Sequence, residues 1–169
     1  MPIIFIGGGS RSGKSTYALT RAGAMGGRLG FIATAQAHDE EMQERIARHQ
    51  ADRPTRFVTR EEPLELAAAL HQSEAAFDTV VVDCLTLWVS NLMLAGHDDL
   101  EGRFAEIVRV ALASPLTLIF VTNEVGCGIV PETELGRRFR DAAGRLNQML
   151  VAAASEVYWM AFGIPTRIK

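Results

Sequence analysis

The sequence contains few cysteines, no long apolar run and little excess charge. Its 169 residues include only two cysteines, Cys84 and Cys127, which are too few for a disulfide framework and favour a reducing compartment. No apolar run reaches the roughly 20 residues that a membrane-spanning helix needs, and the N-terminus lacks the basic segment of a signal peptide. The formal net charge of −3 offers no general attraction for nucleic acid. We therefore expect a cytoplasmic protein with no membrane span and no nucleic-acid partner.

The first apolar run, at residues 3–6, leads into a glycine-rich loop. From Gly8 to Ser15 every position fits G-x-x-x-x-G-K-[ST], the P-loop pattern. Glycines let backbone N–H groups close around phosphate oxygens, Lys14 suits the β- and γ-phosphates, and the Ser15 hydroxyl suits Mg²⁺. A helix follows, and its N-terminus would face the phosphates. The predicted nucleotide-binding residues of this loop are Gly8, Gly9, Ser10, Arg11, Ser12, Gly13, Lys14 and Ser15.

Apolar runs and helical stretches alternate along the rest of the chain. Most of the runs are continuous, as in strands that helices bury on both faces. The predicted strands cover residues 3–6, 29–33, 79–82, 116–121 and 157–162, and a short strand is also indicated within 57–64. The predicted helices cover residues 13–24, 40–51, 63–73, 85–94, 103–113 and 132–154. We expect one α/β domain over residues 1–169, P-loop NTPase-like, with a mostly parallel sheet and helices on both faces.

Polar residues follow two of the predicted strands, where ligands of such sheets bind. Asp83 directly follows the strand at 79–82. In P-loop proteins a carboxylate there holds Mg²⁺ or its water shell opposite the P-loop hydroxyl. A helix cap is the alternative role for Asp83, but the P-loop favours the metal, with Ser15 as the second ligand. The polar residues 122–124 also follow a strand and would face the same cleft.

The helix at 40–51 carries a histidine on its inward stripe. Asp39 is a candidate cap for this helix, and Met42, Ile46 and His49 follow at i, i+4 and i+7. From spacing alone, such a histidine is more often a structural residue than a ligand.

Two further predicted helices begin with residues that suit a helix start. Glu61 and Glu62 precede the helix at 63–73, where carboxylates interact favourably with the helix dipole. Pro131 suits the N1 position at the start of the long helix that follows it. The arginines of that helix would form a solvated face, a subunit contact or a phosphate clamp. They are Arg137, Arg138, Arg140 and Arg145.

Several blocks, taken in order, resemble one enzyme family. Besides the P-loop, they cover residues 32–35, 83–86 and 91–92, and three are distinctive: RIARHQADRP at 45–54, TNEVG at 122–126 and GRRFRDAAGRLNQ at 136–148. Together they resemble the bifunctional adenosylcobinamide kinase / adenosylcobinamide-phosphate guanylyltransferase family over nearly the whole chain.

This resemblance implies two reactions of adenosylcobalamin synthesis. The first phosphorylates adenosylcobinamide with ATP or GTP. The second transfers GMP from GTP to adenosylcobinamide phosphate through a guanylylated histidine, here His49, giving adenosylcobinamide-GDP and pyrophosphate. The resemblance also implies a homotrimer, Mg²⁺ with the nucleotide, and catalytic roles for His49 and Lys14. Besides the loop, the matching GTP contacts are Thr34, Ala35, Gln36, Gln50, Ala51, Asp52, Arg53, one of Glu61 and Glu62, and Asp83.

Two other functions compete with this one. A small-molecule P-loop kinase would use the same loop and leave His49 structural. A nucleotide-dependent switch is disfavoured, because the sequence has neither an N-K-x-D motif nor a D-x-x-G motif after Asp83.

Overall fold

The computed structural model describes the whole chain except residues 38, 39 and 52 and the side chain of Arg45. The cap expected at Asp39 and the nucleotide contact expected at Asp52 therefore lie outside the described residues.

The described residues form a seven-stranded sheet that is parallel except at one edge. Its strand order is β3-β2-β4-β5-β1-β6-β7, and only the β6–β7 pair is antiparallel. This arrangement confirms the predicted mostly parallel α/β sheet. The strands are β1 (Ile3–Gly8), β2 (Leu29–Ala33), β3 (Phe57–Glu61), β4 (Thr79–Asp83), β5 (Thr117–Asn123), β6 (Glu156–Ala161) and β7 (Ile164–Arg167).

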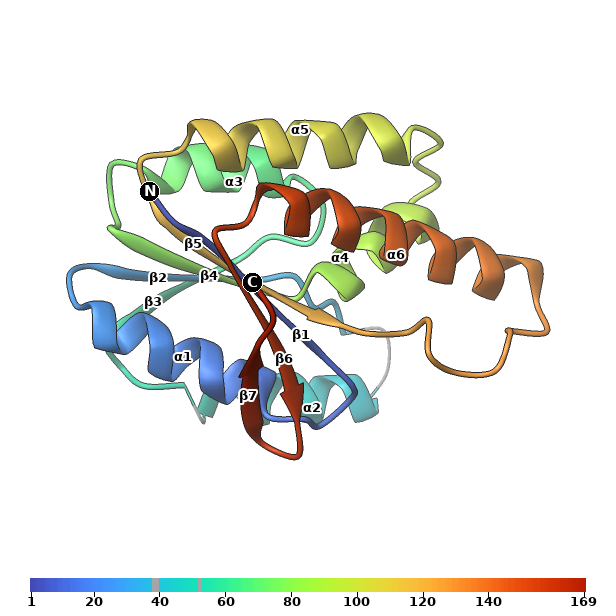
Figure 1. The fold of residues 1–169 in the computed structure, drawn as a ribbon, viewed down its shortest axis with the longest axis horizontal. Helices are drawn as coiled ribbons and strands as arrows, with labels where there is room; N and C mark the ends of the chain where they lie inside the picture. The colour runs from blue at the N-terminus through green and yellow to red at the C-terminus, as the bar shows by residue number, and fades with distance from the viewer. Residues whose placement is uncertain (38–39, 52) are drawn as a thin grey trace.

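Helices cover both faces of the sheet, as Figure 1 shows. On one side lie α1 (Lys14–Met25) and α2 (Glu40–Ala51). On the other side lie α3 (Leu66–Ser73), α4 (Leu85–Leu94), α5 (Leu100–Ala113) and α6 (Glu134–Ala153). None of these helices, within the part of the chain that the structure describes, is long and apolar enough to cross a membrane.

The alternating side chains of β1 show why its apolar run is continuous. Ile3 and Phe5 belong to the larger hydrophobic cluster, on the side of α3 to α6. Ile4 and Ile6 point to the opposite side, where they cluster with Ala18 of α1. A strand that is buried on both faces cannot alternate polar with apolar residues. The P-loop that follows β1 is thereby attached to both cores.

The sequence did not predict the β6–β7 hairpin. The strand expected at 157–162 ends at Ala161, and Phe162 and Gly163 form the turn to β7. β7 contains Pro165, which weakens a strand prediction. An edge strand tolerates proline because one of its sides needs no hydrogen-bond partner.

The start of α6 also differs from expectation. The helix begins at Glu134, and its N-cap is Thr133, whose Oγ1 accepts the N–H of Gly136 at 3.1 Å. Pro131 therefore lies before the helix rather than at its first position, so that prediction is wrong. A threonine hydroxyl bonds a free N–H of the first turn, which proline at N1 does not do. The carbonyl of Pro131 instead accepts a hydrogen bond from Arg137 at 3.0 Å.

Candidate nucleotide-binding site

The loop after β1 is folded around the ammonium group of Lys14. Gly13 has a φ of 92°, a left-handed conformation that suits glycine, and α1 begins at the next residue. Lys14 is only 7% exposed. Its Nζ donates to the carbonyl oxygen of Gly9 at 2.5 Å and to Oγ of Ser12 at 3.3 Å. The positive charge is thus held over the loop, where a phosphate would be bound.

A cavity of about 390 Å³ opens beside this loop. Residues 11–16, from the loop and the first turn of α1, form one wall, and α2 forms the opposite wall. The carboxyl ends of β3, β4 and β5 contribute Glu61, Asp83 and Asn123. The position agrees with the rule that ligands of open α/β sheets bind beyond the carboxyl ends of the strands. The volume lies within the range of small-molecule sites.

Asp83 lies among positive and hydrogen-bonding groups of this cavity. Burial raises the pKa of its carboxyl above the ordinary value, while a hydrogen bond with Ser15 opposes this change, as do the charges of His49, Lys14 and Arg53. The residue preceding α4, at its N-cap position, is Cys84. Asp83 therefore does not occupy the cap position that was the alternative to a metal role.

The inward stripe of α2 faces the cavity. Met42, Ile46 and His49 all line it, with Gln50 beside them. His49 is solvent-exposed rather than buried in the core. A purely structural histidine on an apolar stripe would be packed and hydrogen-bonded inside the protein. The structure thus brings the imidazole and the P-loop to one cavity.

Arg53 follows α2 and is held against an aromatic ring. Its guanidinium carbon lies 3.6 Å from the centre of the Phe31 ring, and Nη1 donates to Oγ1 of Thr59 at 2.5 Å. Burial lowers the pKa of Arg53, while the carboxylates of Asp83 and Glu61 oppose this change. Stacking and the two carboxylates fix this cation in the cavity wall.

The two neighbouring glutamates have different surroundings. Glu61 lines the cavity, and its Oε1 accepts a hydrogen bond from Nε2 of Gln50 at 3.0 Å. Glu62 turns away from the cavity, because its Oε1 accepts the N–H groups of Leu64 and Glu65 at 3.2 and 2.9 Å. Glu62 thus stabilises the turn into α3, the role expected from the charge pattern.

Thr34 connects two strands and does not line the cavity. The residue is fully buried. Its Oγ1 donates to the carbonyl of Cys84 at 2.7 Å and accepts the Cys84 N–H at 2.8 Å. Its own carbonyl accepts Nδ2 of Asn91 at 2.7 Å. This network fixes the end of β2 against the residue that follows Asp83.

The cavity brings together some, but not all, of the expected site residues. Those that line it are Arg11, Ser12, Gly13, Lys14, Ser15, Ala35, His49, Gln50, Arg53, Glu61 and Asp83. The other expected residues that the structure describes lie outside its lining: Gly8, Gly9, Ser10, Thr34, Gln36, Ala51 and Glu62.

Five lining residues were not predicted as site residues from the sequence. Phe31, Ala33, Cys84 and Leu87 lie in apolar stretches that resemble core segments, and Thr16 was expected only as part of the helix after the P-loop. Burial raises the pKa of the Cys84 thiol to about 12, so the thiol stays neutral.

The fold matches several P-loop ATPases of known structure. The RadB recombinase superposes with a TM-score of 0.57 at 16% identity, over 94% of this chain and 73% of that chain. EscN, an ATPase of a type III secretion system in enteropathogenic E. coli, superposes with a TM-score of 0.60 at 12% identity, over 95% of this chain and 43% of that chain. Identities this low show the fold alone. The fold and the loop around Lys14 together define a P-loop nucleotide-binding protein.

Sequence comparison gives the particular family. The family description "CobU: Cobinamide kinase / cobinamide phosphate guanyltransferase" matches residues 4–168. The bifunctional adenosylcobalamin biosynthesis protein CobP of Pseudomonas aeruginosa is 43% identical over 96% of this chain and 94% of its own length. CobU of Salmonella typhimurium, which carries the same description, is 39% identical over 99% of both chains. The chain therefore belongs to the cobinamide kinase / cobinamide phosphate guanylyltransferase family, which confirms the predicted family and class of enzyme.

Proposed function

We propose that the cavity binds the nucleotide of both reactions, with its triphosphate in the loop around Lys14. The observation that carries this proposal is that Lys14, Ser15, Asp83 and His49 line one cavity. The loop supplies the phosphate site, and His49 stands on the opposite wall. The nucleotide would be ATP or GTP for phosphorylation of adenosylcobinamide, and GTP for transfer of GMP to adenosylcobinamide phosphate.

We propose Mg²⁺ as the metal that accompanies the nucleotide. The Ser15 hydroxyl and the Asp83 carboxylate both line the cavity, and their interaction opposes the rise in the Asp83 pKa. Oxygen ligands of this kind suit Mg²⁺. Among the described residues no group of three or more His, Cys, Asp or Glu side chains would hold a metal. Mg²⁺ does not need one, because it commonly takes one or two carboxylates and completes its shell with phosphate and water. When bound, the ion would neutralise charge on the triphosphate.

In the guanylyl transfer, His49 would act as the nucleophile. An imidazole nitrogen attacks the α-phosphorus of GTP, a P–N bond forms, and the P–O bond to the β-phosphate breaks, releasing pyrophosphate. A phosphate oxygen of adenosylcobinamide phosphate then attacks the same phosphorus, the P–N bond breaks, and His49 is restored. Lys14 and the loop N–H groups would stabilise the departing pyrophosphate.

The kinase reaction needs no covalent enzyme intermediate. The hydroxyl of the aminopropanol arm attacks the γ-phosphorus, and the nucleoside diphosphate leaves. Positioning and charge neutralisation carry most of the catalysis in such transfers. The same loop would therefore serve both reactions, whereas His49 would serve only one.

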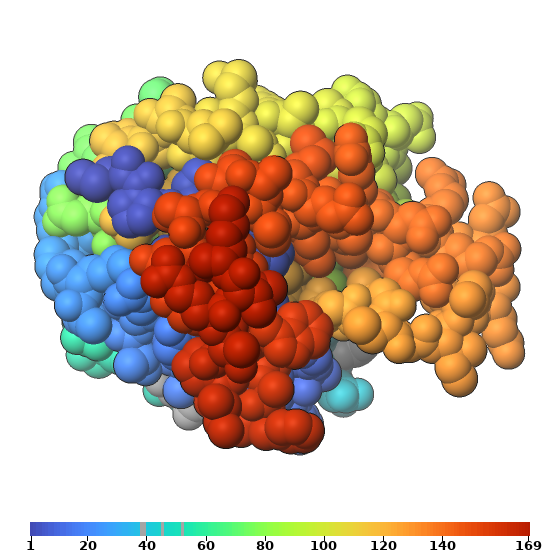
Figure 2. Space-filling model, viewed as in Figure 1, coloured from blue at the N-terminus to red at the C-terminus, as the bar shows by residue number. Residues whose placement is uncertain are grey.

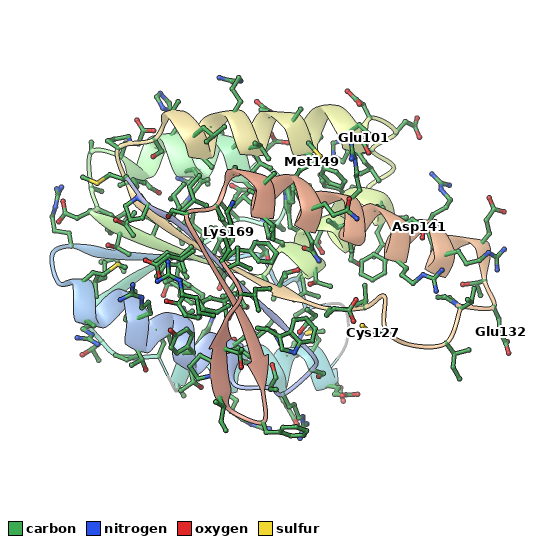
Figure 3. The ribbon with its side chains drawn as sticks, viewed as in Figure 1. Glu101, Cys127, Glu132, Asp141, Met149 and Lys169 are labelled. Atoms are coloured by element: carbon green, nitrogen blue, oxygen red, sulfur yellow. The ribbon has the colours of Figure 1, made fainter. Side chains whose placement is uncertain are left out.

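We also propose a homotrimer in the cytoplasm. The segment between β5 and α6 projects from the body and carries Cys127 and Glu132 (Figure 3). Ile129, in the same segment, is 96% exposed, and an exposed apolar side chain on a projecting segment suits a contact with a second copy of the chain. The cytoplasmic location is supported separately by the two described cysteines, which are free, the state that a reducing compartment favours. Sedimentation analysis tests the trimer, and a stable active monomer would contradict it.

The replacement His49→Asn separates the two activities. We expect it to abolish guanylyl transfer and leave cobinamide phosphorylation measurable. With GTP labelled on the α-phosphate, the wild-type protein should form an adduct that is stable to alkali, labile to acid and located on His49. His71→Asn is the matched control, because His71 is an exposed histidine of α3 that pairs with Glu74 and does not line the cavity.

Normal guanylyl transfer by His49→Asn would show that the covalent step is wrong. If neither the wild-type protein nor His71→Asn formed an adduct while both phosphorylated cobinamide, the chain would be a kinase without the second activity.

A further inference from the structure

An exposed aromatic residue lies at the tip of the β6–β7 hairpin, beside the P-loop. Ala161 pairs with Ile164, so Phe162 and Gly163 alone form the turn. The N–H of Gly163 donates to the carbonyl of Ser12 at 3.1 Å. A Cβ atom added to Gly13 would lie only 3.2 Å from Cα of Gly163. The tip is thus packed and hydrogen-bonded onto the phosphate-binding loop, and Figure 1 shows the hairpin projecting at that end of the sheet.

Phe162 is a poor residue for this position on two counts. It has a φ of 54°, and with Gly163 at 82° the turn has the two positive φ angles of a type I′ hairpin. Asn, Asp and Gly are the residues that favour such positions, and a bulky side chain is strained there. The side chain is also 99% exposed, so the residues that the structure describes bury almost none of it. Strain of this kind concentrates at functional sites.

Further apolar surface accompanies Phe162 on the hairpin. Trp159 pairs with Thr166 and Ala161 pairs with Ile164, so alternation along the strands places Trp159 and Ile164 on the same face. Trp159 is 36% exposed and Ile164 is 65% exposed. In Figure 2 the hairpin, in dark red, lies on the face toward the viewer and reaches the lower edge of the molecule. We call Trp159, Phe162 and Ile164 the hairpin platform.

The reactions of the family need an acceptor beside this loop. The cavity, at about 390 Å³, is of the size that suits one small molecule such as a nucleotide. The corrin macrocycle of cobinamide must therefore lie on the surface around it, while its aminopropanol arm reaches the phosphates. A corrin ring has broad faces rich in methyl groups, and aromatic and branched aliphatic side chains bury such faces favourably.

We propose that the hairpin platform binds the corrin ring of the acceptor and directs its arm toward the phosphates. This inference rests on the proposed cobinamide kinase and guanylyltransferase function. The hydrogen bond between Gly163 and Ser12 couples the platform to the loop, so a ring bound there has a fixed position relative to the nucleotide.

The test compares Phe162→Asn with Leu112→Asn. Leu112 lies on α5, is 62% exposed and is remote from the loop, so it is a matched exposed apolar control. Because asparagine favours a positive φ, Phe162→Asn should keep or raise the melting temperature. Cobinamide absorbs visible light, so its binding is measured by equilibrium dialysis with a non-hydrolysable ATP analogue present. We expect Phe162→Asn to raise the cobinamide Kd and KM about tenfold, the effect of losing a partly buried apolar contact. The KM for ATP and the sedimentation behaviour should not change.

Each other outcome has a definite meaning. Unchanged cobinamide binding by Phe162→Asn, with active wild-type enzyme, would overturn the platform and leave the proposed function intact. A lower melting temperature or a changed oligomeric state would show that Phe162 serves the fold or a contact between copies, and would also overturn it. A wild-type protein that bound nucleotide but no cobinamide would overturn the proposed function and the platform together.

Discussion

Thr34 holds Cys84 through both of its backbone polar groups, with Oγ1 2.7 Å from the Cys84 oxygen and 2.8 Å from the Cys84 nitrogen. Cys84 directly follows Asp83, so the end of β2 determines where the carboxylate at the end of β4 lies.

Thr34→Val tests this connection. Valine has the same shape but no hydroxyl, so it leaves the buried N–H of Cys84 without its partner, whereas the C=O of Cys84 still accepts the N–H of Trp88 at 3.2 Å. An unsatisfied buried group costs roughly 1–3 kcal/mol. We expect a lower free energy of unfolding in a denaturant titration, and slower turnover in both reactions because Asp83 is displaced. Thr34→Ser keeps the hydroxyl, so it should retain most of the wild-type free energy of unfolding and most of the turnover in both reactions. If valine changed turnover without changing stability, Thr34 would act on the nucleotide rather than on the fold.

Glu61 and Glu62 provide a matched pair of substitutions. Glu61→Gln removes a carboxylate that lines the cavity and interacts with the charge of Arg53. It should raise the KM for GTP about tenfold, which corresponds to about 1.4 kcal/mol, and leave the melting temperature unchanged.

Glu62→Gln should show the opposite pattern. Its carboxylate bonds the N–H groups of the turn into α3, and weakening such bonds lowers stability by about 1 kcal/mol. Thermal unfolding and steady-state kinetics on both variants check the pair. A larger kinetic effect from Glu62→Gln would contradict the assignment.

Asp83→Asn tests the metal assignment. An amide lacks the charge that favours Mg²⁺, so we expect a higher Mg²⁺ concentration for half-maximal rate and a fall in both activities of at least about tenfold. Asp78→Asn is the control. Asp78 directly precedes the amino end of β4, where it pairs with Arg28 at 3.0 Å. Equal Mg²⁺ titration curves for the wild type and Asp83→Asn would rule out the metal role.

The link between α1 and β6 predicts a loss of stability in acid. Hydrogen bonds from Tyr158 at 2.7 Å and from Arg21 at 3.0 Å hold the pKa of Glu156 below its ordinary value of 4.5. A carboxyl with a lowered folded-state pKa stabilises the protein above the unfolded value. That contribution disappears as the pH falls through the folded value.

Because the ion pair of Arg21 and Glu156 is partly exposed, its contribution to the free energy of unfolding is modest, at most about 1 kcal/mol. Glu156→Gln should flatten the dependence of unfolding free energy on pH below about 4.5, the ordinary value. Tyr158→Phe should flatten it partly. An unchanged slope in Glu156→Gln would contradict the assignment.

Local patterns predicted most of the fold and much of the cavity. The P-loop, the continuous strands and the inward stripe of Met42, Ile46 and His49 are set by neighbouring residues, so they are visible in the sequence. The different surroundings of Glu61 and Glu62 depend on which N–H groups the next turn leaves free. The stacking of Arg53 on Phe31 joins residues from separate elements. Neither the difference between the two glutamates nor this stacking can be recognised from neighbouring residues in the sequence. The β7 strand was missed because its four exposed residues are held by pairing rather than by burial.

The position of β1 in the sheet determines when the nucleotide site becomes complete during synthesis. β1 leaves the ribosome long before its partners in the sheet, whose paired residues begin at Leu118 and Glu156. Until β5 has emerged, the apolar run of β1 has no neighbour in the sheet, a state in which nascent chains tend to aggregate, and its other edge stays unpaired until β6 follows. The loop beside it likewise has no hairpin to pack against, since Gly163 follows still later. Nucleotide stabilises only a folded site, so it would protect the finished protein and not the growing chain.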